Sequence, residues 1–517
     1  MSDDLGRAVL ACARAYPDRP ALWSRGEVLT YAELLTRAGA LADALVLQSG
    51  LAPGDRVAIL ADRTATLYVA ILAALLAGCA YVPLNPRFPV ARNRSILTRS
   101  GARALISDDR HASGLPELLQ EVSRPPAVLL PQSTTAVDLL VEPILADQIG
   151  PASGRFPCEE AAGELAYIFF TSGSTGEPKG VPIRHASVAA YLRGIGTVFT
   201  PTPDDRILQL VDVTFDLSVH DIFLAWTSGA CLYSVPENAA LLCTRFVEDH
   251  DITAWLSVPS TAGLIRQAGL LEAGSMPSLR YTFFCGEALT GSVAAAWAEA
   301  APHSAVYNIY GPTEATIAIS AYRCVPDQVA SMAVVPLGEP FPEQRMALFA
   351  PDEESRAADM GELCLSGSQV SDGYWEAPEL TARRFFEAEG QRWYRTGDLA
   401  SYDPALGFIY RGRTDHQVKL RGYRVELQEI EAAVRAATRC DLAAVVPWPL
   451  GPEGGALGCI AFVPELRDAE SDVLAQCARS LPDYMVPSRI IAIGTMPLNA
   501  NGKVDHMALR QHPALTG

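Results

Sequence analysis

Strand-like and helix-like patterns alternate along the N-terminal part of the chain, and this alternation constrains the fold more than any other feature. Between residues 21 and 84, short β-branched runs such as "DRVAILA" alternate with Ala- and Leu-rich stretches such as "TYAELLTRAGALADALV". This pattern is typical of an α/β domain in which helices cover a parallel sheet. Because 517 residues exceed what one hydrophobic core usually supports, we expect at least two domains.

The charge of the chain argues against a nucleic-acid partner. Its formal net charge is -18, whereas affinity for nucleic acids comes mainly from Lys and Arg side chains that neutralise phosphates. The eleven cysteines are odd in number and form no C-x-x-C pair. This usage indicates reduced thiols in a cytoplasmic protein and argues against a disulfide framework or a zinc site.

The apolar run "LYVAILAALLAGCAYVP", residues 67–83, is the strongest candidate for a membrane span. It has about the minimum length of a span and ends in Gly, Cys and Pro. We therefore interpret it as a buried helix followed by a strand. The acidic N-terminus shows no signal-peptide pattern, so we expect a cytoplasmic protein without membrane association.

The stretch "FFTSGSTGEPKGV", residues 169–181, predicts an anion-binding loop. It follows the strand-like run "ELAYIFF" and precedes the β-branched run "GVPI". Consecutive small residues leave backbone N–H groups uncovered, and such donors suit phosphate oxygens. The spacing differs from a Walker A motif, because Pro178 stands where that motif requires glycine. A flexible Ser/Gly linker is the alternative, although linkers rarely separate two apolar strands.

A change of pattern predicts a second, smaller domain at the C-terminus. The stretch "HQVKLRGYRVELQEIEAAVRAA" changes near Glu426 from β-like alternation to a helical pattern. We place the boundary at Asp415, which gives a large domain over residues 1–414 and a small domain over residues 415–517.

Several collinear stretches resemble the adenylate-forming superfamily, and in particular amino-acid adenylation domains and D-alanine:carrier-protein ligases. They are "YIFFTSGSTGEPKGV", "FDLSVHDIF", "FFCGEAL", "NIYGPTEATIA", "GELCLSGSQVSDGYW", "YRTGDLA", "GRTDHQVKLRGYRVELQEIE" and "PLNANGKVD". The resemblance covers nearly the whole chain. It implies a large α/β domain with parallel-type sheets, a small mobile α+β domain, and activation of a carboxylate by ATP and Mg²⁺ with release of pyrophosphate.

The resemblance implies roles for residues in these motifs. Lys503 would be the catalytic lysine that offsets negative charge between the substrate carboxylate and the α-phosphate. Thr313 would contact a phosphate and Glu314 would hold Mg²⁺. Tyr310 would stack on the base, and Asp398, in a Gly-containing turn, would accept the ribose hydroxyls. The ATP contacts expected from the resemblance are Thr171, Ser172, Gly173, Ser174, Thr175, Gly176, Lys179, Asn308, Tyr310, Gly311, Asp398 and Arg413.

Asp216 in "FDLSVHDIF" is the basis for expecting an amino-acid substrate. The resemblance places it where amino-acid-activating members hold the substrate α-ammonium group. Alternatively, Asp216 only caps a helix that starts at Leu217. The substrate pocket implied by the resemblance is lined by Leu217, His220, Ser257, Phe283, Cys285, Gly286, Ile309, Ile317 and Ala318.

Phe283 and Cys285 bring bulk into that pocket, so we expect a small, alanine-like amino acid. His220 departs from the D-alanine ligase pattern, which tends to have an apolar residue there. Its imidazole would either bond a polar substrate side chain or fill space. One methylene changes selectivity by only about 1–3 kcal/mol, so the sequence leaves the amino acid and its chirality open.

The resemblance also implies a second half-reaction, in which the aminoacyl group passes to the phosphopantetheine thiol of a carrier protein acting in trans. Asp415 would be the hinge of the small domain, and Gly422 would leave room for the pantetheine arm. Two other functions stay open at this point. An acyl-CoA ligase would accept free coenzyme A, and a nucleotide-binding regulator would keep the fold without turnover.

Overall fold

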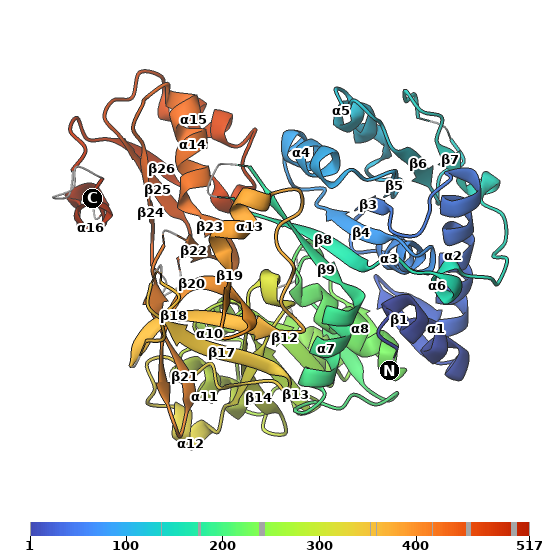
Figure 1. Cartoon of the computed structure of the whole chain (residues 1–517), viewed down its shortest axis with the longest axis horizontal. Coiled ribbons are helices and arrows are strands. Elements are labelled where there is room, and N and C mark those ends of the chain that lie inside the picture. Colours follow the sequence, from blue (N-terminus) through green and yellow to red (C-terminus); the bar gives the residue numbers. More distant parts are fainter. Residues whose placement is uncertain are drawn as a thin grey trace. The chain divides into compact units, whose positions relative to one another are not determined.

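The computed structural model describes residues 2–135, 137–173, 177–236, 243–351, 353–357, 359–415, 417–450, 456–497 and 504–515. Its internal contacts divide the chain into a large and a small compact unit. The large unit comprises Met1–Pro86, Leu97–Phe169 and Gly180–Thr414, and the small unit comprises Arg87–Ile96, Phe170–Lys179 and Asp415–Gly517. Figure 1 shows both units coloured along the chain.

One sheet of the large unit has the parallel arrangement that the alternating pattern predicts. Its strands, in spatial order, are β7 (Ile144–Leu145), β6 (Ala127–Leu130), β5 (Ala104–Ser107), β3 (Arg56–Leu60), β4 (Ala80–Leu84), β8 (Leu165–Thr171) and β9 (Lys179–Arg184). The pairs from β7 through to β8 are all parallel. The predicted strands on both sides of the loop at residues 169–181 are therefore confirmed as β8 and β9.

A second sheet of the large unit carries most of the predicted substrate residues. Its order is β16 (Glu339–Pro340), β15 (Ser320–Arg323), β14 (Ala305–Tyr310), β13 (Tyr281–Phe284), β12 (Ala254–Ser257), β10 (Arg206–Gln209), β11 (Cys231–Ser234), β1 (Pro20–Ser24) and β2 (Glu27–Thr30). The strands from β14 to β1 run parallel, and β15, β16 and β2 join antiparallel. Carboxyl ends of neighbouring parallel strands meet at one edge, where ligand sites of α/β folds form.

A third sheet of the large unit is antiparallel. It consists of β17 (Gln344–Phe349), β18 (Met360–Gly367), β20 (Gln391–Asp403) and β19 (Phe385–Ala388), with β21 (Gly407–Arg413) paired to β20. Asp398 lies inside β20. The expectation that it lies in a turn was wrong, because Gly397, with φ of +77°, is accommodated within the strand.

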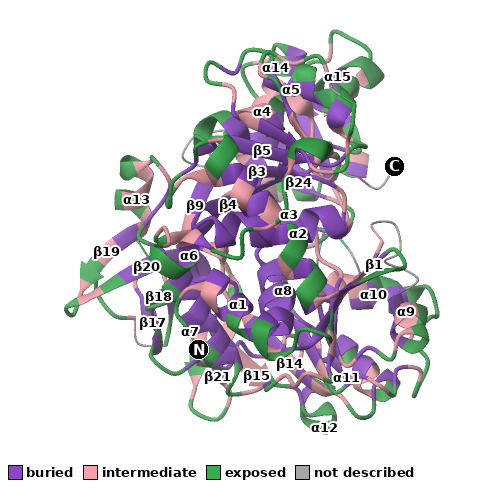
Figure 2. Cartoon of the chain, turned by 90° about the vertical axis from the view of Figure 1, so that its right-hand side faces the viewer, coloured by how far each residue is buried: buried purple, intermediate pink, exposed green. Residues whose placement is uncertain are grey.

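The large unit also contains a set of helices. They are α1 (Leu5–Ala15), α2 (Tyr31–Asp43), α3 (Ala65–Leu76), α5 (Leu115–Leu119), α6 (Pro157–Glu160), α7 (His185–Ile195), α8 (Leu217–Ser228), α9 (Cys243–Asp249), α10 (Pro259–Gln267), α11 (Gly291–Ala300), α12 (Pro326–Val329) and α13 (Pro378–Arg384). α4 (Val90–Ser100) has residues in both units. Every residue of α3 is buried, as are the first turns of α8 (Figure 2).

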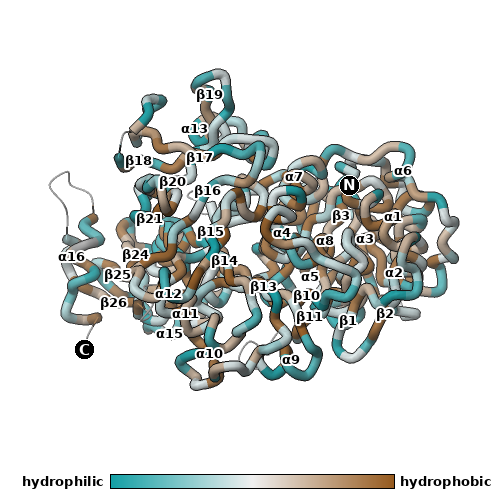
Figure 3. The backbone as a smooth tube through the Cα atoms, turned by 90° about the horizontal axis from the view of Figure 1, so that it is seen from below, coloured by the Kyte–Doolittle hydropathy of each residue, from teal (hydrophilic) through white to brown (hydrophobic). Residues whose placement is uncertain are grey.

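The apolar run at residues 67–83 forms the buried helix and strand that the sequence predicts. It contributes most of α3 and of β4, and its hydropathy can be followed in Figure 3. Across the described part of the chain, no helix combines the length and apolar character that crossing a membrane requires.

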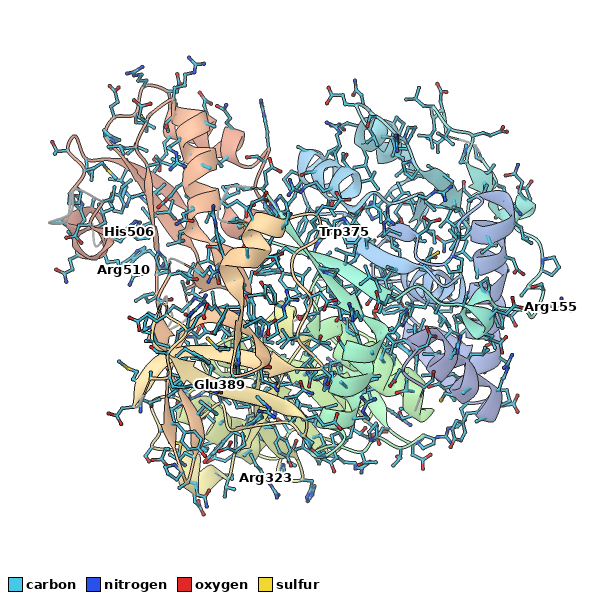
Figure 4. All side chains as sticks on the ribbon, in the orientation of Figure 1. Arg155, Arg323, Trp375, Glu389, His506 and Arg510 are labelled. Atoms are coloured by element: carbon cyan, nitrogen blue, oxygen red, sulfur yellow. The ribbon has the colours of Figure 1, made fainter. Side chains whose placement is uncertain are left out.

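Residues 415–517 account for most of the small unit and form α+β structure. The hairpin of β22 (Gln417–Leu420) and β23 (Tyr423–Glu426) leads into α14 (Leu427–Thr438), which confirms the predicted change of pattern near Glu426. A further sheet contains β24 (Ala444–Pro447), β25 (Cys459–Val463) and β26 (Arg489–Ala492), and the remaining helices are α15 (Glu470–Cys477) and α16 (His506–Arg510). Figure 4 labels His506 and Arg510 on α16.

The cysteines behave as the sequence predicts for reduced thiols. All eleven lie among the described residues and none forms a disulfide. Each is buried except Cys440, which is partly exposed. Burial raises the pKa of buried thiols, for example that of Cys79 to about 12, so they remain protonated at neutral pH.

Candidate active site

The segment that follows β14 brings Glu314 and Tyr374 together. Thr313 and Glu314 lie in a short 3-10 turn, Thr313–Ala315, and the Glu314 side chain is completely buried. Its Oε1 accepts a hydrogen bond of 2.8 Å from the Tyr374 hydroxyl. A buried carboxylate needs such donors or a cation to offset the loss of hydration. Carboxylate oxygen is also the ligand type that Mg²⁺ prefers, so Glu314 fits the predicted metal role.

The backbone next to Glu314 is held in an unusual conformation. Thr316 and Ile317 have φ of +57° and +72°, a region that is costly for β-branched residues and that occurs mostly at functional sites. The Gln369 side-chain amide supports this bend by donating to the carbonyls of Ala315, Thr316 and Ala318, at 3.3, 3.3 and 2.7 Å. The bend directs Ile317 and Ala318, both buried, into the interior.

Tyr310, Asp398 and Arg413 form one hydrogen-bonded group. The Tyr310 hydroxyl donates to Oδ2 of Asp398 at 2.6 Å, and the Arg413 guanidinium pairs with Oδ1 of the same carboxylate. Burial, together with the Asp398 charge, raises the pKa of Tyr310 well above its ordinary value, so the hydroxyl keeps its proton. The sequence predicted these residues as ATP contacts, and the structure brings the three together from the ends of β14 and β21 and from the interior of β20.

Asn308 and Gly311 have local structural explanations. The Asn308 amide donates to the carbonyls of Val335 and Pro336, at 3.3 and 2.8 Å, so it fixes the neighbouring segment. A Cβ atom at Gly311 would lie 2.6 Å from Cα of Ala318. Glycine at this position therefore permits the close approach of the two chain segments.

Asp216 does not act as a side-chain helix cap. It occupies the N-cap position of α8, but its backbone is helical and its side chain makes no capping hydrogen bond. The residue is only 8% exposed. The capping alternative is therefore not supported, and the binding of an ammonium group by Asp216 stays a prediction.

The other predicted substrate residues lie on α8 and at the ends of adjacent strands. Phe283 is aligned with Leu256 and Tyr307 across β12, β13 and β14. The Cys285 amide continues this alignment by donating to the carbonyl of Ser257 at 3.1 Å. The buried members are Leu217, His220, Ser257, Phe283, Cys285, Ile309 and Ile317, and Gly286 adopts φ of +90° beside them.

Within the small unit, the described part of the predicted phosphate loop makes specific contacts. The Ser172 hydroxyl donates to the carbonyl of Arg424 at 2.9 Å, and the Gly173 amide donates to Oε2 of Glu429 at 3.3 Å. The Thr171 hydroxyl is buried and makes no hydrogen bond to a described residue, which fits the predicted contact with a phosphate oxygen. Lys179 is also buried and begins β9.

Some predicted residues lie outside the described part of the chain. These are Ser174, Thr175 and Gly176 of the loop and Lys503 near the C-terminus. Of the remaining small-unit residues, Asp415 accepts a hydrogen bond of 3.3 Å at Oδ1 from the backbone N–H of Gln417. Gly422 adopts φ of +87° in the β22–β23 turn.

Sequence reasoning missed contacts between residues that are far apart in the chain. Tyr374 and Gln369 lie in the quoted stretch "GELCLSGSQVSDGYW" but were given no role. The next residue, Trp375, is labelled in Figure 4 and donates its indole N–H to the carbonyl of Arg99 at 3.2 Å. Another missed pair is Arg92 and Glu429 of the small unit, whose buried side chains form an ion pair of 2.5 Å.

Comparisons with known proteins identify the class. Residues 10–375 match the AMP-binding enzyme family. The chain therefore belongs to the AMP-binding enzymes, which are AMP-forming ligases that use ATP.

More specific relatives are amino-acid adenylation proteins. The chain is 36% identical over 497 residues to L-proline--[L-prolyl-carrier protein] ligase of Streptomyces coelicolor, covering 93% of this chain and 91% of the relative. It is 34% identical over 504 residues to tyrocidine synthase 2 of Brevibacillus parabrevis, covering 96% of this chain but spanning only 13% of that protein.

A solved structure shows the same fold. The Vibrio cholerae adenylation domain AlmE, in complex with glycyl-adenosine-5'-phosphate, superposes with a TM-score of 0.87 and 36% identity, covering 99% of this chain and 98% of AlmE. The predicted fold, a large α/β domain with parallel sheets and a small C-terminal domain, is thereby confirmed.

Proposed function

We propose that this protein activates a small amino acid as its aminoacyl adenylate and then transfers it to the phosphopantetheine thiol of a separate carrier protein. Asp216 is the observation that carries the proposal. Asp216 is buried at the N-cap position of α8, and its side chain does not cap the helix. A carboxylate charge with little hydration strongly attracts the ammonium group of an amino acid.

The small size of the substrate is supported by the walls of the pocket. Phe283 is completely buried and Cys285 is 1% exposed, so both occupy volume at the ends of adjacent strands. AlmE was solved with a glycyl adenylate and the Streptomyces coelicolor ligase acts on L-proline. Both amino acids are compact, which agrees with a short side chain for the substrate of this chain.

In the first step the carboxylate of the amino acid attacks the α-phosphorus of ATP, and pyrophosphate leaves. Asp216 would hold the ammonium group, so the carboxylate is presented in a fixed orientation. Tyr310 would stack on the base, and Asp398 and Arg413 would hold the ribose. Mg²⁺, bound through Glu314, would supply charge stabilisation for the phosphates. We propose that Lys503 offsets the negative charge that develops in the transition state.

In the second step the carrier thiolate attacks the acyl carbon, and AMP leaves. We propose Asp415 as the hinge for the intervening movement, because the large unit ends at Thr414 and the small unit continues from Asp415. Gly422, which has φ of +87° and no side chain, would leave space for the pantetheine arm. Both assignments depend on the predicted division of the chain into a large domain, residues 1–414, and a small domain, residues 415–517.

Substrate-dependent ATP–pyrophosphate exchange tests the proposal. The panel contains glycine, both enantiomers of alanine and serine, proline, 2-aminobutyrate, β-amino acids, and aryl and fatty acids. We expect exchange with a small amino acid, followed by loading of a phosphopantetheinylated carrier protein. Exchange only with acids that lack an amino group would contradict the proposal and favour an acyl-CoA ligase. Absence of exchange with every acid would favour a regulator.

A further inference from the structure

A tyrosine and a histidine on neighbouring helices form a buried pair beside Asp216. Tyr191 lies on α7 and His220 on the first turn of α8, and the two side chains are 0% and 1% exposed. The Tyr191 hydroxyl and Nδ1 of His220 are 2.5 Å apart. Phe283 packs edge-on against the imidazole, with ring centroids 5.2 Å apart.

The surroundings determine which imidazole nitrogen carries the proton. Burial lowers the pKa of His220 to about 3, so the ring is neutral and has one N–H. Among the described residues, His220 is the only hydrogen-bond partner of the Tyr191 hydroxyl. Because that hydroxyl proton has no other acceptor, Tyr191 donates to Nδ1. The imidazole proton must therefore be on Nε2.

No hydrogen bond joins Nε2 of His220 to another described residue, so the resulting Nε2–H group has no acceptor in the described part of the chain. His220 shares the first turn of α8 with Leu217 and packs on Phe283, and both belong to the predicted substrate pocket. A ligand group at this position would supply the missing acceptor.

The charge of the surroundings limits what that ligand group can be. Burial raises the pKa of Asp221, the next residue, well above its ordinary value, and within the described part of the chain neither of its oxygens has a hydrogen-bond partner. Because its pKa is lowered to about 3, the His220 ring is uncharged at neutral pH and supplies no positive charge here. A substrate carboxylate would be buried here without a counter-charge, which is unfavourable, whereas a neutral hydroxyl oxygen is a suitable acceptor.

We propose that Tyr191 is a positioning residue that holds His220 as its Nε2–H tautomer, and that this N–H selects a short amino acid with a side-chain hydroxyl, as in serine. The inference rests on the proposed function, because it assigns the substrate class of the same site. A site built to bond a hydroxyl discriminates strongly against an analogue that lacks it. The analogue of matching size is 2-aminobutyrate, in which a methyl group replaces the hydroxyl.

The test compares kcat/KM for serine and 2-aminobutyrate by pyrophosphate exchange with the full chain. We expect a ratio on the order of 10⁴ for the unchanged protein, which is the discrimination that hydrogen-bonding sites achieve against an analogue without the hydroxyl. His220→Leu removes the donor and should reduce the ratio at least tenfold. Tyr191→Phe should reduce it mainly through a higher KM for serine. His220→Gln retains an acceptor for Tyr191 and an N–H donor, so it should restore most of the ratio.

The control variant and a spectroscopic measurement separate positioning from a loss of stability. Tyr68→Phe removes another buried hydroxyl, which bonds Gln209 and Ser234 at 2.7 and 2.6 Å. It should lower stability but leave the ratio unchanged. In histidine labelled with ¹⁵N, the His220 signals should show the Nε2–H tautomer, and Tyr191→Phe should give a mixture of tautomers.

The outcomes distinguish this inference from the proposed function. Equal kcat/KM values for serine and 2-aminobutyrate, or an unchanged ratio in His220→Leu, would overturn the inference and leave amino-acid activation intact. Pyrophosphate exchange only with an amino acid that lacks a side-chain hydroxyl would also overturn the inference and leave amino-acid activation intact. Absence of exchange with any amino acid would overturn both. If the variants do not fold, the serine to 2-aminobutyrate ratio of kcat/KM and the His220 tautomer, both measured on the unchanged protein, still test the inference.

Discussion

The Tyr374 hydroxyl donates a hydrogen bond of 2.8 Å to the completely buried carboxylate of Glu314, which is 60 positions away in the chain. This contact joins the segment after β18 to the 3-10 turn after β14. It holds the carboxylate that we propose as the Mg²⁺ ligand.

Tyr374→Phe should weaken both the fold and the metal site. Hydrogen bonds to charged groups contribute about 1.5–3 kcal/mol, so we expect the free energy of unfolding to fall by about that amount. The Mg²⁺ concentration for half-maximal exchange should rise. Urea unfolding and a Mg²⁺ titration measure these effects. The control is Tyr402→Phe, whose hydroxyl bonds Glu339 at an exposed position, and equal losses in both variants would contradict the prediction.

Lys503→Ala should abolish adenylation and leave ATP binding largely intact. The reason is that a cation acting on transition-state charge contributes more to the rate than to ground-state binding, and loss of one such group costs about 10²–10³-fold in kcat. Pyrophosphate exchange and calorimetric ATP binding check the two parts. Arg510→Ala removes an exposed cation from the same C-terminal region and should leave both unchanged. Normal exchange in the Lys503 variant would refute the catalytic assignment.

Asp216→Asn should raise the KM for the amino acid by about tenfold to a hundredfold, because the buried carboxylate loses its charged hydrogen bond to the ammonium group. The KM for ATP in the same assay serves as the internal control and should change little. An unchanged KM for the amino acid would remove the main reason for an amino-acid substrate.

His220 should make the protein less stable in mild acid. Its pKa in the folded state is about 3, below the ordinary value of 6.5, so below pH 6.5 the unfolded state binds a proton that the folded state rejects. The stability is fully present above pH 6.5 and falls by about 1.4 kcal/mol per pH unit as the pH decreases toward 3. The raised pKa of Asp221 has the opposite effect, because it stabilises the folded state as the pH falls. The contribution of His220 is therefore measured as the difference between the unchanged protein and a His220 variant.

Urea unfolding of the unchanged protein and of His220→Gln between pH 5 and pH 7.5 provides that difference. The variant should lose less stability on acidification, by about 2 kcal/mol at pH 5 relative to pH 7. Parallel curves would show that His220 takes up protons equally in both states.

The elements of the fold were predictable because their signals are local. The alternation of strands and helices, the loop between β8 and β9, and the change from β23 to α14 follow from hydrophobic period and from Gly and Pro placement. The family resemblance supplied most site residues. It also gave the group of Tyr310, Asp398 and Arg413, which the structure brings together.

The support around these residues was not predictable, since it depends on tertiary contacts. Nothing in the local sequence indicates that Tyr374 reaches Glu314, that Gln369 holds the bend at Ile317, or that Tyr191 meets His220. The wrong placement of Asp398 in a turn has a related cause. Gly397 is a turn signal, but the pairing of β20 with β18 and β21 overrides it.

Every cysteine except Cys440 is buried, so a thiol-specific reagent should modify the folded protein almost exclusively at Cys440. A maleimide dye should attach at Cys440, in the small unit between α14 and β24, because the buried thiols are sterically hidden and held in their unreactive protonated form. A fluorophore could thus be installed without engineering. Its signal would report on the small unit through each stage of turnover.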